Sequence, residues 1–487
     1  MDVLTQIQRL INIKKSFINV LANIGYVVST FQEIISSIEN HKQGDLDKSL
    51  MSALTAEDEA VRMDESIYDL HERLFAQNET LLSSVDTLAS KSFYETNLVY
   101  FKSKPCNAAI NDAFNYCRSL MFAELDQATD CTTLNSTFRR CNNLVAVELP
   151  PSLNKCKDLR YTFSICTSLR KVNLPKQLPA CTSMAYIFEN CRNLDIDIEF
   201  TYLPKVTKLD NAFGGCSSLS SVTLPSEMPA LNSMSAAFRD CRSLSSVTLP
   251  TEMPALTTLY EAFSGCISLS SVTLPSAMPA LTSMGAAFND CSSLSTPLDI
   301  DCTNVLVIPN CKIFNNCKKI PSLTLHSTAN IHNFSYFIYN CTSLTSVTGL
   351  DLSNAFLSVD EVKQVAAANK ITISDTNAET VYRQTSWIGC SQTNKKLTNM
   401  PLQGTLYRSG FSIASCPLTA ESLYTWFVAL YDWTNNPEAK TTDDTTHTLT
   451  VNATSLAKMQ AYTPPEGLSG EAIYEQALDR GWIIATI

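Results

Sequence analysis

Glycine and histidine are scarce in this chain. Only 13 of its 487 residues are glycine, against roughly 7 % in an average protein, which excludes collagen-like and glycine-rich linker architectures. The five histidines are scattered, so a His-based metal or proton-transfer site would have to assemble from distant parts. Basic residues are outnumbered, 36 against 47 acidic ones, for a net charge of −11. A nucleic-acid-binding protein needs a basic footprint, so we expect no nucleic-acid partner.

Motifs that carry catalysis are also missing. The sequence contains no glycine-rich phosphate-binding loop, no HExxH zinc motif and no GxSxG nucleophile elbow. Cys302 and Cys311 lie farther apart than the close pairs that usually bind zinc. Asp299 and Asp301 suggest acid–base or calcium chemistry, but such a pair is more often a solvated turn. We therefore predict a non-enzymatic protein with no cofactor and no metal.

Long hydrophobic runs are absent as well. The uncharged stretch 16–32 is interrupted by polar residues such as Asn19 and Asn23, and it is shorter than the about 20 apolar residues of a membrane helix. The beginning of the sequence lacks the basic segment and apolar core of a secretory signal. We expect no membrane span and no cleaved signal, and hence folding in a reducing cytoplasm, where cysteines stay thiols.

A repeat dominates the middle of the chain. The pattern F-x-x-C-x-x-L or a close variant recurs ten times, and six consecutive steps from Cys141 to Cys291 are 25 residues long. A fixed period with constant apolar columns predicts a solenoid, in which each coil buries its apolar face against its neighbours. The LSSVTLP stretch of the unit predicts a strand that ends before Pro225, because proline cannot donate to a strand ladder.

Six positions of each unit are expected to point inward, the last three at the spacing of a helical turn. In the unit that begins at Cys216 they are Leu219, Val222, Leu224, Leu231, Met234 and Phe238.

Most of the 18 cysteines fall into apolar columns of the repeat. Ten occupy the Cys column itself, and Cys131, Cys156 and Cys181 stand where later units carry Leu or Val. We expect buried free thiols, which behave as small hydrophobic residues. A disulfide between neighbouring coils is possible on distance alone, but parallel inward side chains point in the wrong mutual direction.

The unit F-x-x-C-x-x-L-x-x-V-x-L-P resembles the BspA-like leucine-rich repeats over about residues 106–350. The resemblance implies a leucine-rich-repeat solenoid. It also implies one of two roles, because proteins of this class are commonly surface adhesins or binding parts of phage virion proteins. The adhesins normally carry a secretion signal and an anchor, and this sequence departs from that pattern.

Residues 1–95 have a helical pattern. Apolar residues alternate steps of three and four over four heptads, and a second apolar stripe flanks the first. A stripe this wide favours a homotrimer or burial in a larger assembly; the alternative is a helix packed on its own domain. The heptad residues, which we assign to oligomerisation and attachment, are Leu10, Ile13, Phe17, Val20, Ile24, Val27, Phe31, Ile34 and Ile38.

The period is lost after residue 350. Ser358 and Glu361 form a capping-box pair before the helix DEVKQVAAAN and a strand-like KITIS segment. Residues 375–417 are predicted to be irregular. The end of the chain predicts a helix AESLYTWFVALYDW, a strand HTLTVN, a helix near 453–461, and a helix and strand in EAIYEQALDRGWIIATI. This ending loosely resembles the terminal module of repeat proteins encoded by phages of gut bacteria, and it would cap the last coil.

The expected fold class is α+β. A coiled-coil-like helical region covers 1–95, a leucine-rich-repeat β-solenoid of about ten repeats covers 96–350, an irregular transition covers 351–417, and a small αβ cap covers 418–487. Outward strand positions predict uncharged hydroxyl ladders that could bind polysaccharide or a protein loop; the alternative is a ladder of good strand formers without a ligand. These candidate binding residues are Ser221, Thr223, Ser246, Thr248, Ser271 and Thr273.

Three functional hypotheses follow. The first is a structural protein of a tailed-phage virion, such as a fibre, decoration or receptor-binding element. Its N-terminal helices would bind other virion proteins, and its repeat rod would bind a host surface polysaccharide or protein. The second is a bacterial cell-surface adhesin of the BspA-like class. The third is an intracellular scaffold that binds one protein partner.

Overall fold

The computed structural model describes residues 86–101, 106, 108–275, 278–306, 311–355, 358–368, 373–384, 388, 394–407, 410–435 and 446–487. Most of the helical region expected over 1–95 lies outside these residues, and so does the entire heptad pattern from Leu10 to Ile38.

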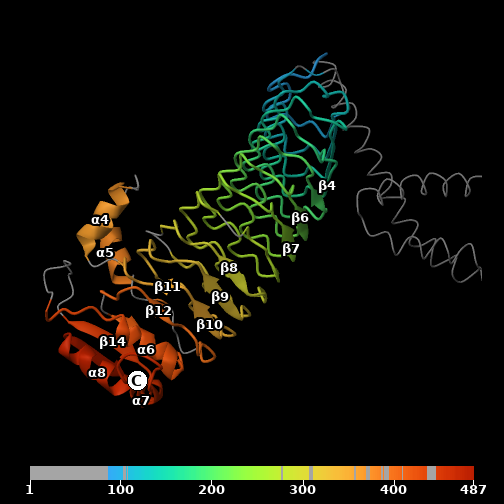
Figure 1. The fold of residues 1–487 in the computed structure, drawn as a ribbon. Coiled ribbons are helices and arrows are strands. Elements are labelled where there is room, and N and C mark those ends of the chain that lie inside the picture. Colours follow the sequence, from blue (N-terminus) through green and yellow to red (C-terminus); the bar gives the residue numbers. More distant parts are fainter. Residues whose placement is uncertain are drawn as a thin grey trace, which may run out of the picture.

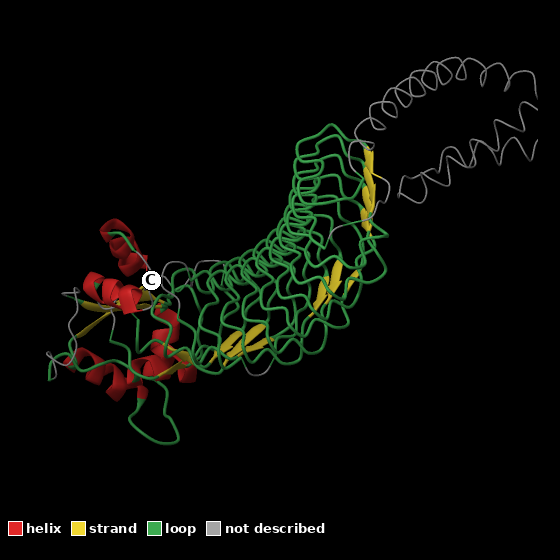
Figure 2. Ribbon diagram, turned by 90° about the horizontal axis from the view of Figure 1, so that it is seen from above, coloured by secondary structure: helices red, strands yellow, loops and turns green. Residues whose placement is uncertain are grey.

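The repeat region is a curved stack of coils (Figure 1). Each regular coil contributes one short strand, and neighbouring strands pair in parallel. The strands form three sheets, β1–β4, β5–β7 and β8–β10, along the outer side of the curve (Figure 2). Their bounds are β1 Tyr100–Phe101, β2 Phe122–Glu124, β3 Ala146–Glu148, β4 Lys171–Val172, β5 Ile198–Glu199, β6 Ser221–Thr223, β7 Ser246–Thr248, β8 Leu298–Ile300, β9 Ser322–Leu325 and β10 Ser346–Thr348.

The strand ladder is interrupted between β4 and β5 and between β7 and β8. The segment 271–273 has the same Ser-Val-Thr sequence as β6 and β7 but forms no strand. The prediction of one strand in every unit is therefore wrong for this coil. The strand segments lie on the outer side of the curve, where neighbouring coils are farthest apart. Segments of identical sequence therefore cannot all keep the about 4.8 Å spacing of a hydrogen-bonded ladder.

A second ladder, here called the turn ladder, follows the segment that leads into each conserved cysteine. In one coil the N–H groups of Phe238 and Asp240 donate to the carbonyls of Ala262 and Ser264 in the next coil, at 2.8 and 2.7 Å. The intervening N–H groups donate three residues back within their own coil. Ala236 and Asp240 adopt left-handed φ angles of 52° and 57°. Such angles cost about 1 kcal/mol or more in a non-glycine residue, which the bonds between coils offset.

Stacked phenylalanine rings form the axis of the core. Successive rings from Phe93 to Phe314 lie nearly parallel, with centroids 5.0 Å apart between Phe114 and Phe138 and 5.9 Å apart between Phe288 and Phe314. The predicted inward positions are confirmed, although the segment with helical spacing forms hydrogen-bonded turns and no α-helix. All six are at most 2 % exposed: Leu219, Val222, Leu224, Leu231, Met234 and Phe238.

The stack begins before residue 96 and continues beyond residue 350. Leu88 and Phe93 are fully buried in the first described coil. At the other end β11 (Leu350–Asp351) pairs with β12 (Leu402–Gln403), and the side-chain amide of Asn394 donates to the carbonyl of Ile338 at 3.0 Å. The chain thus leaves the solenoid after β11 and returns to the same stack.

The segment between β11 and β12 contains two helices, α4 (Val359–Ala368) and α5 (Asp375–Gln384) (Figure 1). The Ser358 half of the predicted capping box of α4 is confirmed, since the N–H of Glu361 donates to the Ser358 hydroxyl at 3.0 Å. The expectation of irregular chain from residue 375 is wrong for α5. This helix packs its buried face against α4, in a small core separate from that of the coils, so a tertiary contact stabilises a polar segment with little intrinsic helical signal.

The C-terminal module is a three-stranded parallel sheet with helices, and its predicted elements are confirmed apart from their bounds. The sheet contains β13 (Phe411–Ser412), β14 (His447–Val451) and β15 (Trp482–Thr486). The helices are α6 (Ala420–Val428), α7 (Ala453–Gln460) and α8 (Gly470–Asp479).

Helix α6 covers the last coil of the solenoid. The indole N–H of Trp426 donates to the carbonyl of Met400 at 2.9 Å, and the N–H of Met400 donates to the Ser422 hydroxyl at 2.7 Å. The module and the coils therefore share one apolar core. No helix in the described part of the chain combines the length and the apolar character that a membrane crossing requires.

Candidate functional site

The strand side carries the hydroxyl ladder that the sequence predicts. Thr223 and Thr248 are exposed and lie opposite each other in the register of β6 and β7. Ser221 and Ser246 are also opposite each other, but the Ser221 hydroxyl donates to Asp197 Oδ1 at 2.6 Å. Thr223, Thr248 and Ser246 are exposed, whereas the Ser221 hydroxyl is already engaged within the protein.

The ladder is shorter than expected. Ser271 and Thr273 are exposed, but their segment forms no strand and does not continue the paired register of β6 and β7. The structure brings four of the six candidate residues into two matched pairs and leaves the other two beside them. An extended row of hydroxyls in register is thus limited to two coils here.

The hydroxyls of a neighbouring column of serines form hydrogen bonds between adjacent coils. Each of these serines lies one residue before a predicted position and donates to the carbonyl of the matching residue one coil earlier: Ser245 to Ser220 at 3.2 Å, and Ser270 to Ser245 at 3.3 Å. Ser295 donates to Ser270 in the same way, at 3.4 Å. These hydroxyls hold adjacent coils together, a role that sequence reasoning did not separate from ligand binding.

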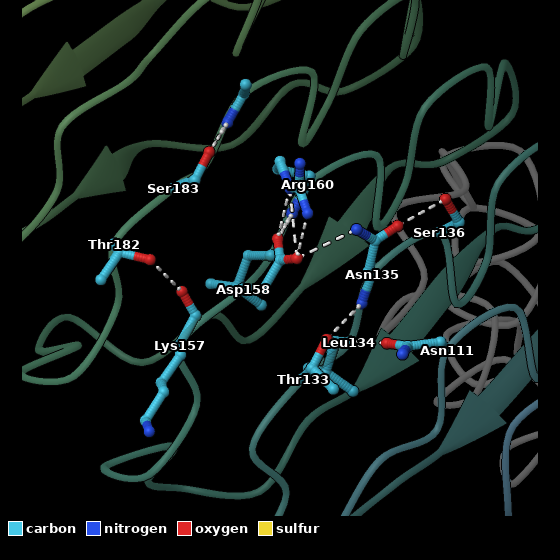
Figure 3. A network of polar contacts seen from close by, with 12 residues as sticks. Asn111, Thr133, Leu134, Asn135, Ser136, Lys157, Asp158, Arg160, Thr182 and Ser183 are labelled. Atoms are coloured by element: carbon cyan, nitrogen blue, oxygen red, sulfur yellow. Dashed lines mark hydrogen bonds and ion pairs between the residues drawn. The ribbon is translucent and has the colours of Figure 1, made fainter.

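A polar network lies where the turn ladder begins (Figure 3). The Asn135 amide donates to Asp158 Oδ2 at 3.0 Å, and Arg160 contacts the same carboxylate through Nη2 at 2.8 Å and through Nε. Burial opposes ionisation of Asp158, but the hydrogen bonds from Arg160 and Asn135 outweigh it and lower the pKa of that carboxyl. The Thr182 hydroxyl donates to the carbonyl of Lys157 at 3.0 Å (Figure 3). The network stabilises contacts between coils, and sequence reasoning missed it because its members lie about one repeat apart.

The residues considered for metal or acid–base chemistry do not assemble into a site. Cys302 and Cys311 are buried, and burial raises the pKa of the Cys302 thiol to about 12. Asp299 contacts His326 at 2.6 Å on the surface, and Asp301 accepts the N–H of Thr303 at 3.0 Å. Across the described ranges no group of three or more metal-binding side chains is found.

The predicted thiol columns are buried. Cys131, Cys156 and Cys181 are at most 1 % exposed, as are the conserved cysteines of the repeat from Cys117 to Cys341. All described cysteines are free thiols. Burial raises the pKa of the column thiols, which keeps them protonated and unreactive near neutral pH.

The model of the BspA type leucine rich repeat region, which contains six copies, matches residues 69–195, 132–258, 182–297 and 260–379. Together these segments cover more than half of the chain. The chain belongs to the BspA-type leucine-rich-repeat family. No curated protein shows significant sequence similarity to this BspA-type protein.

Several solved bacterial structures are similar to this BspA-type protein. A leucine-rich-repeat protein of T. pallidum is 26 % identical over 36 % of this chain and 78 % of its own, with a TM-score of 0.28. One from Bacteroides ovatus is 18 % identical over 63 % of this chain and 78 % of its own, with a TM-score of 0.28. One from Leptospira interrogans is 13 % identical over 63 % and 88 %, with a TM-score of 0.22.

Membership of the family suggests a protein-binding or adhesin-like role. Leucine-rich-repeat proteins are typically non-enzymatic scaffolds that bind protein partners, and BspA-type members are often associated with cell surfaces. The fold is suited to such a role because a solenoid exposes a long surface at little structural cost. The residues assigned to attachment, from Leu10 to Ile38, lie outside the described part of the chain.

Proposed function

We propose that this BspA-type protein is a non-enzymatic adhesive rod. Its solenoid carries the recognition surface, and its N-terminal region attaches and oligomerises it. The observation that carries the proposal is the continuous stack from Leu88 to Leu406, closed at its end by α6. Because the rod buries its own apolar columns, its outward side chains are free to vary and to bind a partner.

The carrier that we propose is the virion of a tailed phage, on which the rod serves as a fibre, decoration or receptor-binding element. The wide heptad stripe between Leu10 and Ile38 supports attachment through a homotrimer or through other virion proteins. The buried free thiols suit assembly in a reducing host cytoplasm. The expected target is a polysaccharide or protein on the host surface, and Thr223 and Thr248 are candidate contacts.

The second candidate is a bacterial cell-surface adhesin. Family membership favours it, because BspA-type proteins are often surface-associated. Both candidates use the same rod for binding, and they differ in what carries its N-terminal end.

Fractionation of a bacterial culture that produces the protein, after phage induction, tests what carries the rod. An antibody against the full chain is expected to label density-purified phage particles. Signal in the cell envelope instead would identify an adhesin, and signal confined to the soluble cytoplasm would contradict both proposals and favour a scaffold. Added full-length protein should also compete with particles or cells for the host surface, and the double variant Thr223→Ala/Thr248→Ala should compete less well.

A further inference from the structure

Arginine and tyrosine side chains gather on the turn ladder of the first coils. The guanidinium carbons of Arg140 and Arg118 lie 4.9 and 6.0 Å from the ring centre of Tyr116. One coil further, the guanidinium of Arg139 lies 5.0 Å from the ring centre of Tyr161. These residues, here called the arginine cluster, concentrate positive charge on a chain whose net charge is −11.

A pocket opens within the arginine cluster. Its volume is about 480 Å³, and it is lined by Arg118, Arg140, Asn142, Asn143 and Ile165. This volume lies within the range of small-ligand sites and accommodates one or two side chains of a partner. The two guanidinium groups and the two amides supply hydrogen-bond donors around one shallow space.

In the described part of the chain no carboxylate forms an ion pair with the arginine cluster. Among the ion pairs of the described residues, none includes Arg118, Arg139 or Arg140. Among the described residues, Arg140 Nη1 donates to the Tyr116 hydroxyl, at 2.6 Å. The Nε atoms of Arg139 and Arg140 are buried without a hydrogen-bond partner, which is costly for a charged group.

A repeat further along the same rod pairs the equivalent arginine with a carboxylate. Arg239 occupies the position after the core phenylalanine, as Arg139 does, and it pairs with Glu261 at 2.9 Å. The residue that corresponds to Glu261 in the coil after Arg139 is Tyr161. Arg139 therefore faces an aromatic ring at the position where Arg239 faces a carboxylate.

The tyrosine faces are already occupied. Tyr161 is covered by Arg139 on one side and stacks on Tyr186 at 4.6 Å. Tyr116 is covered by Arg140 and contacts Tyr94 at 6.1 Å. Stacking of a sugar ring on these faces is thereby disfavoured, so a ligand is recognised through charge and hydrogen bonds.

We propose that the pocket of the arginine cluster binds the carboxylates of an acidic segment of a protein partner. An Arg fork pairs with a planar carboxylate through two parallel hydrogen bonds. A bound carboxylate would also reduce the mutual repulsion of the Arg118 and Arg140 guanidinium groups. The assignment rests on the proposed function, because it names the partner chemistry of the adhesive rod.

Fluorescence anisotropy with the full-length protein and a labelled oligoglutamate peptide tests the site. Binding is expected at low ionic strength and should weaken with added salt. Arg118→Gln and Arg140→Gln should each reduce affinity about tenfold, and Arg118→Lys should have a smaller effect because it keeps the charge but loses the fork. Arg118 is exposed, so its substitution should leave the fold intact even where Arg140→Gln disturbs the packing on Tyr116.

Arg192→Gln is the matched control. Arg192 is exposed and follows a column cysteine, as Arg118 does, but it lies three coils further along the rod. Its substitution should change affinity by less than about twofold. Equal losses for Arg192→Gln and Arg118→Gln, or no loss for either arginine of the pocket, would overturn the site.

A second probe distinguishes carboxylates of a protein from carboxylates of an acidic polysaccharide. Oligogalacturonate should bind more weakly than oligoglutamate; the opposite order, or no binding of either probe, would overturn the assignment to an acidic protein segment. A full chain that adheres to the host surface without binding oligoglutamate contradicts this site alone. A full chain that binds oligoglutamate but is absent from particle and envelope fractions contradicts the proposed function alone.

Discussion

The Sγ atom of Cys241 donates a hydrogen bond to the carbonyl oxygen of Phe213, at 3.0 Å, in the preceding coil. The same oxygen accepts the N–H of Cys216, also at 3.0 Å. This relationship recurs in every unit from Cys117 to Cys341. The column thus requires a small side chain that tolerates complete burial and still donates a hydrogen bond, and cysteine meets both conditions.

Substitution of Cys241 should separate these two requirements. Cys241→Ala removes the donor and leaves a small cavity, and we expect it to lower the free energy of unfolding by about 1–3 kcal/mol. Cys241→Ser keeps a donor and should cost less. Urea unfolding of the full chain measures both values. A serine variant as unstable as the alanine variant would show that the hydrogen bond does not explain the column.

Thiol labelling should report the burial of the column. Burial raises the pKa of Cys216, Cys241 and Cys266 well above the ordinary value, so a bulky thiol reagent should not react with them in the native protein. Among the described cysteines Cys106 is the one only partly buried, and burial raises its pKa to about 11. It should react first, and slowly below that pH. Rapid labelling of the column without denaturant would contradict this arrangement.

The same thiols should make stability fall in alkali. In the unfolded chain they ionise near pH 8.5, whereas in the folded chain they remain protonated. Above that pH the unfolded state releases protons that the folded state retains, so each buried thiol lowers stability by about 1.4 kcal/mol per pH unit. The urea midpoint should be nearly constant below about pH 8 and fall steeply above about pH 9. Cys241→Ser should show a shallower fall, and an unchanged midpoint would refute the linkage.

The phenylalanine stack should be sensitive to truncation. Phe238 is fully buried, with ring centroids 5.3 Å from Phe213 and 5.5 Å from Phe263. Phe238→Ala should cost about 3–5 kcal/mol, because contacts are lost on both faces of the ring. Thr248→Ala, on the exposed strand side, is the control and should stay within about 0.5 kcal/mol. A melting curve of Phe238→Ala that matches the control would contradict the inward stack.

Deletion of residues 1–85 should separate attachment from recognition. Leu88 and Phe93 belong to the first described coil, so the cut is placed before them and not at residue 95. The remaining rod should be folded and mainly monomeric by light scattering, because its core is completed by its own coils and by α6. It should also fail to enter particles or to attach to the envelope. A truncated protein that still oligomerises would place the assembly surface in the repeats.

Periodicity made the repeat architecture predictable. The buried columns that contain Phe238 and Cys241 are each marked by one residue type at a constant spacing, and burial follows directly from that pattern. Helix α4 was predictable from Ser358 and Glu361 because a capping box is a local signal. Helix α5 was not, because its helical state depends on packing against α4.

The sequence was sufficient to predict the buried columns of the repeat, the stacking of the coils and the αβ character of the C-terminal segment. These features depend on local spacing or on contacts that repeat at one period. The tertiary structure alone decided that segment 271–273 leaves the strand ladder while the identical β6 and β7 keep it, because curvature accumulates over many coils. It alone also brought Arg118, Arg140 and Ile165 to one pocket, since residues from three successive coils become neighbours only when the coils are stacked in register.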